Sequence, residues 1–244
     1  MSAAVRTQGH ARPGPHAVLT IELSQRAGSV ALRPASGAAA VSADVPASDE
    51  HGDHLMDSID RLCASAGVFA RDLRMIAVST GPGGFTGLRV ACATARAIAD
   101  ATGAGTVAVP SALVAARTLV ADRLWEPVDG ALACVILSAK GQDAWSSTVQ
   151  VESGVPRLVG SGLVQAGSEL AHVAIGDRHA RALWPAVEAA RWLEARFCAT
   201  ACLEVAEALD AAGEACDPAQ LLPIYPRPPE AVALWDRRHG MQPR

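Results

Sequence analysis

The chain has 244 residues and a mass of 25.1 kDa, which is enough for one large domain or for two small ones with their own cores. Half of the residues are hydrophobic, yet no run approaches the ~18 uninterrupted apolar residues of a membrane span, so we expect a soluble protein. A formal net charge of −4 argues against a protein whose whole surface binds nucleic acid.

The N-terminus and the cysteines are typical of a cytoplasmic protein. Residues 1–16 contain Arg, His, Gly and Pro but no apolar segment of a secretory signal, and we interpret them as a disordered tail. The six cysteines form no Cys-x-x-Cys pair and have no histidines at the spacing of a zinc site. We therefore expect buried free thiols, no metal site and a cytoplasmic location.

The first part of the chain, residues 17–110, alternates between strand and helix patterns. The expected elements are strands at 17–23, 29–32 and 38–41, a helix at 53–66, a strand at 75–79, a helix at 90–102 and a strand at 106–109. The first helix is amphipathic and ends at Gly67, and the second is rich in Ala. An antiparallel meander followed by strand–helix–strand alternation predicts an α/β unit with a mixed sheet.

A second unit is expected over residues 111–222. The expected elements are a helix at 111–122 with Ser111 as its N-cap, a hairpin of strands at 131–137 and 144–151, a strand at 172–175 and a long helix at 191–212. Residues 223–244 are rich in Pro, and we expect them to form an extended tail.

The run from Gly81 to Arg89 is the most informative local feature, because its glycines stand between a strand pattern and a helix pattern. It reads Gly-Pro-Gly-Gly-Phe-Thr-Gly-Leu-Arg. No Lys follows the glycines, as a Walker A loop requires, and the spacing of a dinucleotide fingerprint is missing. The glycines could still direct backbone N–H groups at an anion, or they could allow another backbone to approach closely. The glycine pattern alone leaves both uses open.

Residues 76–89 resemble the signature of the bacterial TsaB (YeaZ) family, glycoprotease-like proteins of tRNA threonylcarbamoyladenosine biosynthesis. Only Gly84, in place of Ser, departs from the nine-residue core of that signature. Weaker similarities continue in the family's order and spacing at residues 19–24, 28–32, 51–56, 137–145, 176–177 and 223–227.

The resemblance implies an actin-like, Hsp70-like ATPase fold, related to ribonuclease H, with two related lobes and mixed sheets, the second lobe being degenerate. It also implies a subunit that has lost ATPase chemistry and has no catalytic residue of its own. Its partners would be the catalytic subunit TsaD (YgjD) and the ATPase TsaE, with tRNA contacted indirectly. No cofactor is expected on this chain alone, ATP and Mg²⁺ belonging to the assembled complex, and alone the chain would form a homodimer.

The family arrangement also implies which residues form the site. Helix 53–66 and the Ala-rich helix would pack against TsaD, and we expect the partner to contact Leu55, Ile59, Phe85, Thr86, Leu88 and Arg89. The residues closest to a nucleotide, if one binds, would be Glu22, Ser24, Gly81, Gly83, Gly84 and Gly87. Glu22, Ser138 and Lys140 depart from the family's Asp, Asp and Arg, so their polar roles differ.

These observations favour a non-catalytic scaffold subunit. The alternative is a stand-alone nucleotide-binding protein of the actin-like ATPase class, in which the run from Gly81 holds phosphate. A protease is unsupported, because no Ser, His and Asp set is linked by its spacing. With Phe85, Leu88 and Arg89 in the same run, we interpret the glycines as clearance for a neighbouring subunit.

Overall fold

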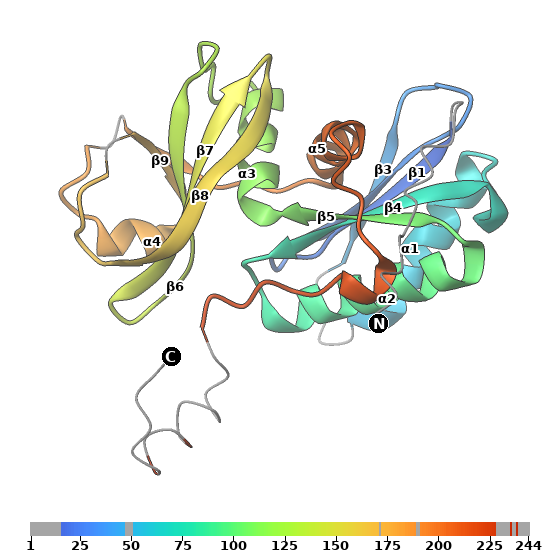
Figure 1. Ribbon diagram of the computed structural model, residues 1–244, viewed down its shortest axis with the longest axis horizontal. Coiled ribbons are helices and arrows are strands. Elements are labelled where there is room, and N and C mark those ends of the chain that lie inside the picture. The colour runs from blue at the N-terminus through green and yellow to red at the C-terminus, as the bar shows by residue number, and fades with distance from the viewer. Residues whose placement is uncertain are drawn as a thin grey trace, which may run out of the picture.

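The computed structural model describes residues 16–46, 51–170, 172–188 and 191–227, together with Trp235 and Arg238. The predicted N-terminal tail, apart from His16, and most of the predicted tail beyond residue 227 lie outside these residues, as do the side chains of 51–53 and 138–140. Two five-stranded mixed sheets stand side by side, each with its own helices (Figure 1). Within the described part of the chain, no helix is both long and apolar enough to cross a membrane.

The first sheet has the order β3-β2-β1-β4-β5. Its strands are β1 (Ala17–Glu22), β2 (Gly28–Arg33), β3 (Val41–Val45), β4 (Leu73–Gly81) and β5 (Gly105–Pro110). Helices α1 (His51–Ser65) and α2 (Phe85–Thr102) cover one face, and a one-turn 3-10 helix (Ala70–Asp72) leads into β4 (Figure 1). Leu19 and Ile21 of β1 point into this layer, whereas Val18 points to the opposite face, as the two-residue period of a strand requires.

The second sheet repeats the topology of the first. Its strands are β6 (Leu132–Lys140), β7 (Asp143–Glu152), β8 (Val155–Gln165), β9 (Val173–Gly176) and β10 (Trp192–Glu194), in the order β10-β9-β6-β7-β8. In both sheets the first three strands form an antiparallel meander. The fourth strand then pairs in parallel with the first, and the fifth pairs in parallel with the fourth. The short helix α4 (Arg178–Leu183) follows β9 as α2 follows β4. The expected actin-like fold of two related lobes is confirmed.

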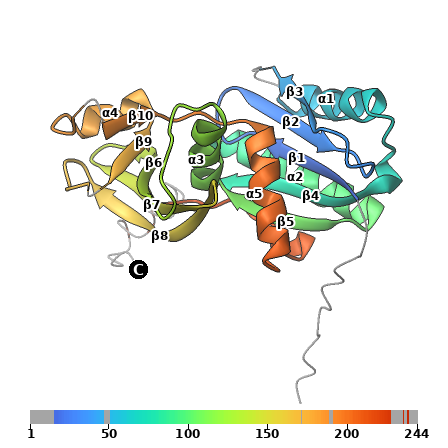
Figure 2. The same ribbon diagram turned by 90° about the horizontal axis from the view of Figure 1, so that it is seen from above.

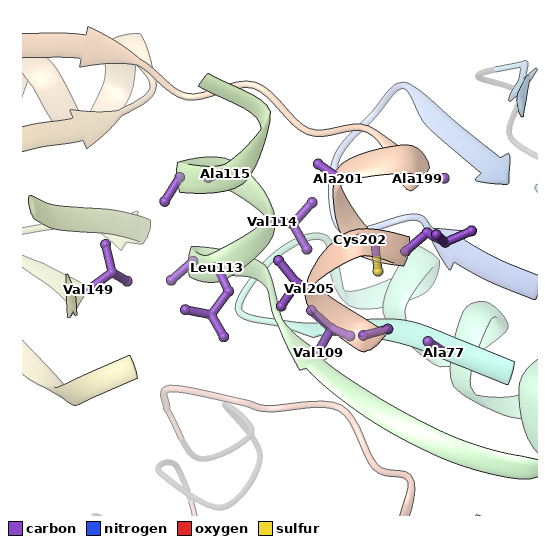
Figure 3. Packing of buried hydrophobic residues seen from close by; sticks show 14 of the residues in the cluster. Ala77, Val109, Leu113, Val114, Ala115, Val149, Ala199, Ala201, Cys202 and Val205 are labelled. Carbon is purple, nitrogen blue, oxygen red and sulfur yellow. The ribbon is translucent and has the colours of Figure 1, made fainter. Parts of the chain in front are cut away.

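Two helices join the sheets through one continuous core. Helix α3 (Ser111–Ala121) follows the last strand of the first sheet, and α5 (Ala199–Ala211) follows the last strand of the second, and they lie side by side at the junction (Figure 2). Leu113 and Ala115 of α3 pack in one cluster with Ala77 and Val109 from the first sheet, Val149 from the second, and Cys202 and Val205 of α5 (Figure 3). The junction is therefore apolar and closely packed rather than open.

The chain after α5 returns along the first sheet and then reaches the second. Cys216 bridges to Thr106 of β5, donating its N–H to the Thr106 carbonyl at 2.8 Å, and a one-turn 3-10 helix (Pro218–Gln220) follows. Leu221 is buried, and Ile224 donates its N–H to the Thr80 carbonyl at 2.7 Å. Arg227 then donates from Nη2 to the Asp143 carbonyl of β7 at 2.6 Å. Residues 216–227, here called the C-terminal segment, thus contact both sheets.

Several sequence-based expectations were wrong in their boundaries. The third strand is Val41–Val45 rather than 38–41, because its register against β2 is set by pairing and its own sequence is mostly polar and exposed. The helix expected at 90–102 begins at Phe85, so half of the glycine run is helical. Ser111 is not the N-cap of α3, since Pro110 occupies that position and the Ser111 hydroxyl instead shares a 2.7 Å hydrogen bond with Ser79.

The second sheet contains the larger errors. The helix expected at 191–212 is strand β10 followed by α5, because residues 192–194 pair in parallel with β9 and this pairing overrides their helical pattern. Strand β8 was missed, because Pro156, Gly160 and Gly162 are typical of turns, and such residues are tolerated in an edge strand. Helix α4 was missed as well, although Asp177 caps it by accepting the Ala180 N–H at 2.7 Å.

The core at the junction predicts a large loss of stability when one of its large side chains is truncated. Leu113 is 1% exposed, and Leu113→Ala should lower the free energy of unfolding by about 2–5 kcal/mol, through lost burial and a cavity between the sheets. Urea unfolding measures this loss. The matched control is Leu124→Ala, just beyond α3 and 45% exposed, which should cost less than about 1 kcal/mol. Equal losses for the two variants would contradict a core at the junction.

Candidate functional site

The glycine run connects β4 to α2 at the end of the first sheet where β1 also ends. Gly84 is the N-cap of α2, and no side chain caps this helix. Gly81 has φ +104°, a left-handed conformation that favours glycine, and a Cβ there would lie 2.8 Å from Leu88 Cδ1. The run therefore comprises the last residue of β4, a tight turn at residues 82–84 and the first five residues of α2.

Two glycines of the run allow close approach to the chain's own turn between β1 and β2. A Cβ on Gly83 would lie 2.2 Å from the Ser24 carbonyl oxygen, and a Cβ on Gly87 would lie 2.2 Å from the Leu23 carbonyl oxygen. Gly84 donates its N–H to the Ser24 carbonyl at 2.8 Å. The interpretation of these glycines as clearance for a neighbouring subunit is thus corrected, since Gly83 and Gly87 make room for residues 23 and 24.

Glu22 and Ser24 lie beneath this contact and are closed off from solvent. They are 1% and 0% exposed. Glu22 Oε1 accepts the Ser24 N–H at 2.7 Å, while Oε2 and the Ser24 hydroxyl meet no hydrogen-bond partner among the described residues. Burial raises the pKa of the Glu22 carboxyl, and neighbouring groups of Ser24 and Ser79 offset only part of this effect. The structure brings the predicted Glu22, Ser24 and glycine set together, but as a sealed cluster.

Three residues predicted to contact a partner belong to the core instead. Leu55 and Leu88 are 0% exposed and Ile59 is 5% exposed. Leu55 and Ile59 pack with the sheet in the layer under α1 and α2, because they form the apolar stripe of α1. Side chains so buried cannot touch a second protein, so the predicted docking set is reduced to Phe85, Thr86 and Arg89, which are exposed.

An exposed cluster of aromatic and basic side chains forms at the start of α2. Phe85 is 51% exposed, and the Arg89 guanidinium lies over its ring, 3.7 Å from the ring centroid. Arg89 Nε donates to the Tyr225 hydroxyl at 3.0 Å, and the Phe85 and Tyr225 ring centroids are 5.2 Å apart. Sequence reasoning missed Tyr225, although it lies in the resembling segment 223–227, because no local pattern links residues 136 positions apart.

The face of α2 beyond this cluster is small and uncharged at its next two exposed positions. Ala93 and Ala97 follow Phe85 and Arg89 at four-residue spacing and are exposed, whereas Ala91, Ala95 and Ala99 pack in the core. We call Phe85, Thr86, Arg89, Ala93 and Ala97 the α2 surface. A surface of this kind allows another helix to approach closely, with an aromatic and arginine anchor at one end.

The cysteines are free and play no visible part in this site. All six are free. Cys92 and Cys202 are buried, as expected, whereas the other four are only partly buried, namely Cys63, Cys134, Cys198 and Cys216. Burial raises the pKa of Cys92 to about 11 and raises that of Cys202 as well, which disfavours reactive thiolates. Among the residues that the structure describes, no group of three or more His, Cys, Asp or Glu side chains could hold a metal ion.

Comparison with known protein families gives one match to part of the chain. Residues 45–150 match the family described as TsaD, tRNA N6-adenosine threonylcarbamoyltransferase. This range contains α1, the glycine run, α2 and α3. No curated protein matches the chain significantly.

Two solved structures resemble the chain over nearly its full length. YeaZ from Pseudomonas aeruginosa superposes with a TM-score of 0.75 at 21% identity, covering 86% of this chain and 99% of that one. A structure described as an uncharacterized protein with similarity to peptidase YeaZ from Pseudomonas aeruginosa gives a TM-score of 0.76 at 22% identity, covering 87% and 100%. The chain therefore has the fold of YeaZ, and the resemblance carried by residues 76–89 is confirmed.

Proposed function

We propose that this chain is a non-catalytic scaffold subunit in the threonylcarbamoylation of tRNA, where it binds a TsaD-like catalytic subunit and acts with TsaE. The observation that carries this proposal is the YeaZ fold over 86% of the chain, in which residues 45–150 also match the TsaD family. That range holds both helices on the exposed side of the first sheet. A cytoplasmic location is part of the proposal.

The α2 surface is the place where the partner would bind. Its exposed alanines allow a partner helix to approach to a short interaxial distance, and Phe85 and Arg89 are residue types that concentrate binding energy in interfaces. Two further charged residues of α2, the partly buried Arg96 and the exposed Asp100, lie within one turn of Ala93 and Ala97, so the partner must accommodate them as well. In the absence of TsaD the same surface would pair two copies of the chain, giving a homodimer.

The transfer chemistry would belong to the partner. An actin-like ATPase needs an accessible, ionised acidic residue near the end of its first strand to hold the metal of a nucleotide. Glu22 is buried, its pKa is raised, and the Gly84 N–H that could meet a phosphate is already bonded to Ser24. These contacts favour the scaffold over the alternative, a stand-alone nucleotide-binding ATPase. As part of the proposal, ATP and Mg²⁺ bind to other subunits.

The proposal predicts an activity that depends on the partner. The purified chain alone should form no threonylcarbamoyladenosine on tRNA, and adding it to TsaD and TsaE should raise the yield, measured by mass spectrometry of digested nucleosides. Size-exclusion chromatography should show a complex with TsaD. ATP hydrolysis by the isolated chain at a rate that TsaD leaves unchanged would contradict the scaffold and support the alternative.

The α2 surface predicts a charge-sensitive interface. Ala93→Glu places a long acidic side chain where the partner helix should pack, one turn from both Arg89 and Arg96, and it should weaken TsaD binding about tenfold or more, measured by calorimetry. Ala211→Glu, on the exposed end of α5 across the sheet, is the matched control and should bind normally. Normal binding by Ala93→Glu would place the interface elsewhere.

The sealed Glu22 predicts a pH-dependent stability. Because its folded pKa is raised above 4.5, its contribution to stability is present below that pH and is lost as the pH rises through the folded pKa. Glu22→Gln removes this loss, so the stability of the variant relative to wild type should increase as the pH rises. Urea unfolding from about pH 4 to 8 measures the difference.

The control for this comparison is Glu194→Gln, because the Glu194 side chain is 64% exposed. A difference between Glu22→Gln and wild type that is the same at every pH would contradict a raised pKa of Glu22. That outcome would also reopen the alternative of a charged nucleotide site.

A further inference from the structure

The Arg89 side chain is held in one orientation before any partner binds. Phe85 supports one face of its guanidinium at 3.7 Å, and the Tyr225 hydroxyl accepts its Nε–H at 3.0 Å. The Tyr225 ring centroid is also within 5.8 Å of the guanidinium carbon. An arginine fixed in this way has already lost much of the rotamer freedom that binding would otherwise remove.

Tyr225 is itself fixed by the C-terminal segment. The neighbouring Ile224 donates its N–H to the Thr80 carbonyl at the end of β4, and Leu221 is fully buried four residues before Tyr225. The segment lies against the glycine run at Gly81. A Cβ at this position would come within 3.1 Å of the Ile224 carbonyl oxygen. Tyr225 is therefore a rigid part of the surface around Arg89.

The arrangement leaves the outer end of the guanidinium available. The structure records no acceptor for the two Nη groups and no carboxylate paired with Arg89 among the described residues, whereas Arg33 and Arg117 each have a glutamate partner. Arg89 is the fifth residue of α2, beyond the first turn in which the helix dipole acts, so its unpaired Nη donors are the feature that calls for an anion. An anion supplied from outside would satisfy them.

We propose that Phe85, Arg89 and Tyr225 form a preorganised clamp for one carboxylate of the partner protein, with Tyr225 as the positioning residue. Since Tyr225 occupies Nε, the carboxylate would bind end-on, accepting one hydrogen bond from each Nη group. This inference rests on the proposed function for the existence of the partner, and it adds the acidic residue that the partner must present beside the helix lying on Ala93 and Ala97.

The neighbourhood favours a protein carboxylate over an RNA phosphate. Beyond Arg89, helix α2 carries one further cation, the partly buried Arg96, and an exposed acidic residue, Asp100, whereas a sugar–phosphate backbone is bound through several cations in a row. A helix lying on Ala93 and Ala97 with one Asp or Glu at its edge fits both the small side chains and the exposed charge of Arg89.

The test is a double-mutant cycle on binding to TsaD, measured by calorimetry at low and high salt. Tyr225→Phe keeps the ring and removes the acceptor, and it should weaken binding about threefold to tenfold. Arg89→Gln should weaken binding about tenfold or more and should reduce the salt dependence. Arg89→Lys keeps the charge but lacks the two Nη groups that would bind the carboxylate together, and it should bind little better than Arg89→Gln. Tyr225→Phe should have no effect in the Arg89→Gln background.

The control is Arg178→Gln, since Arg178 is 94% exposed on the second lobe and its loss should leave binding unchanged. Thermal unfolding establishes that each variant folds. If the wild-type chain binds TsaD but Tyr225→Phe weakens binding equally with Arg89 and with Arg89→Gln, the clamp is overturned and the scaffold proposal remains. Weakened tRNA binding with normal TsaD binding in Arg89→Gln would overturn it in favour of RNA, and no wild-type binding to TsaD would overturn the proposed function as well.

Discussion

The close approach of the glycine run to the turn after β1 is the constraint on which the site depends. Gly83 and Gly87 lie against the carbonyls of Ser24 and Leu23, and a methyl group at either position would overlap them. This contact covers Glu22 and fixes the position of the first turn of α2 against the turn after β1. It also directs Phe85 and Arg89 outward, because the adjacent positions of the same helical turn, Gly87 and Leu88, are used for packing. The burial of Glu22 and the exposure of the α2 surface are thus two results of one contact.

The rest of the fold keeps this contact in place. The two sheets share one topology, and the helices that follow them, α3 and α5, pack together and against both sheets in a single core. Thr20 of β1 donates its hydroxyl to the Ala199 carbonyl at 2.8 Å, so α5 lies directly over the strand that ends in Glu22. A closely packed junction of this kind resists the opening between lobes that access to a nucleotide would require. It suits a subunit that presents a fixed surface.

Local sequence patterns predicted the elements of the first lobe well and those of the second lobe poorly, for physical reasons. The β1, β4 and α1 patterns are strong because each buries one continuous apolar face. Strand β8 pairs with its neighbour β7 across a short turn at residues 153–154, and β10 pairs in parallel with β9, but neither strand carries such a face. The same limit applies to the site. The motif located Phe85 and Arg89. The apolar period of α1 is typical of a face that packs on a sheet, but the family arrangement assigned Leu55 and Ile59, like the buried Leu88, to the partner. No local pattern shows that Tyr225 returns to Arg89 from the end of the chain.

Arg89 is a charged side chain whose hydrogen-bond donors are satisfied only in part. The described residues supply it with an aromatic face and a hydroxyl but no anion. Natural sequences depart from local rules mainly where function requires it, and the compensating interaction is then found elsewhere. Here the chain provides the support for the guanidinium from two segments, α2 and the C-terminal segment, and leaves its outer donors unpaired. The missing interaction is therefore expected across the interface that we propose, which links the unpaired donors of Arg89 to the proposed binding surface.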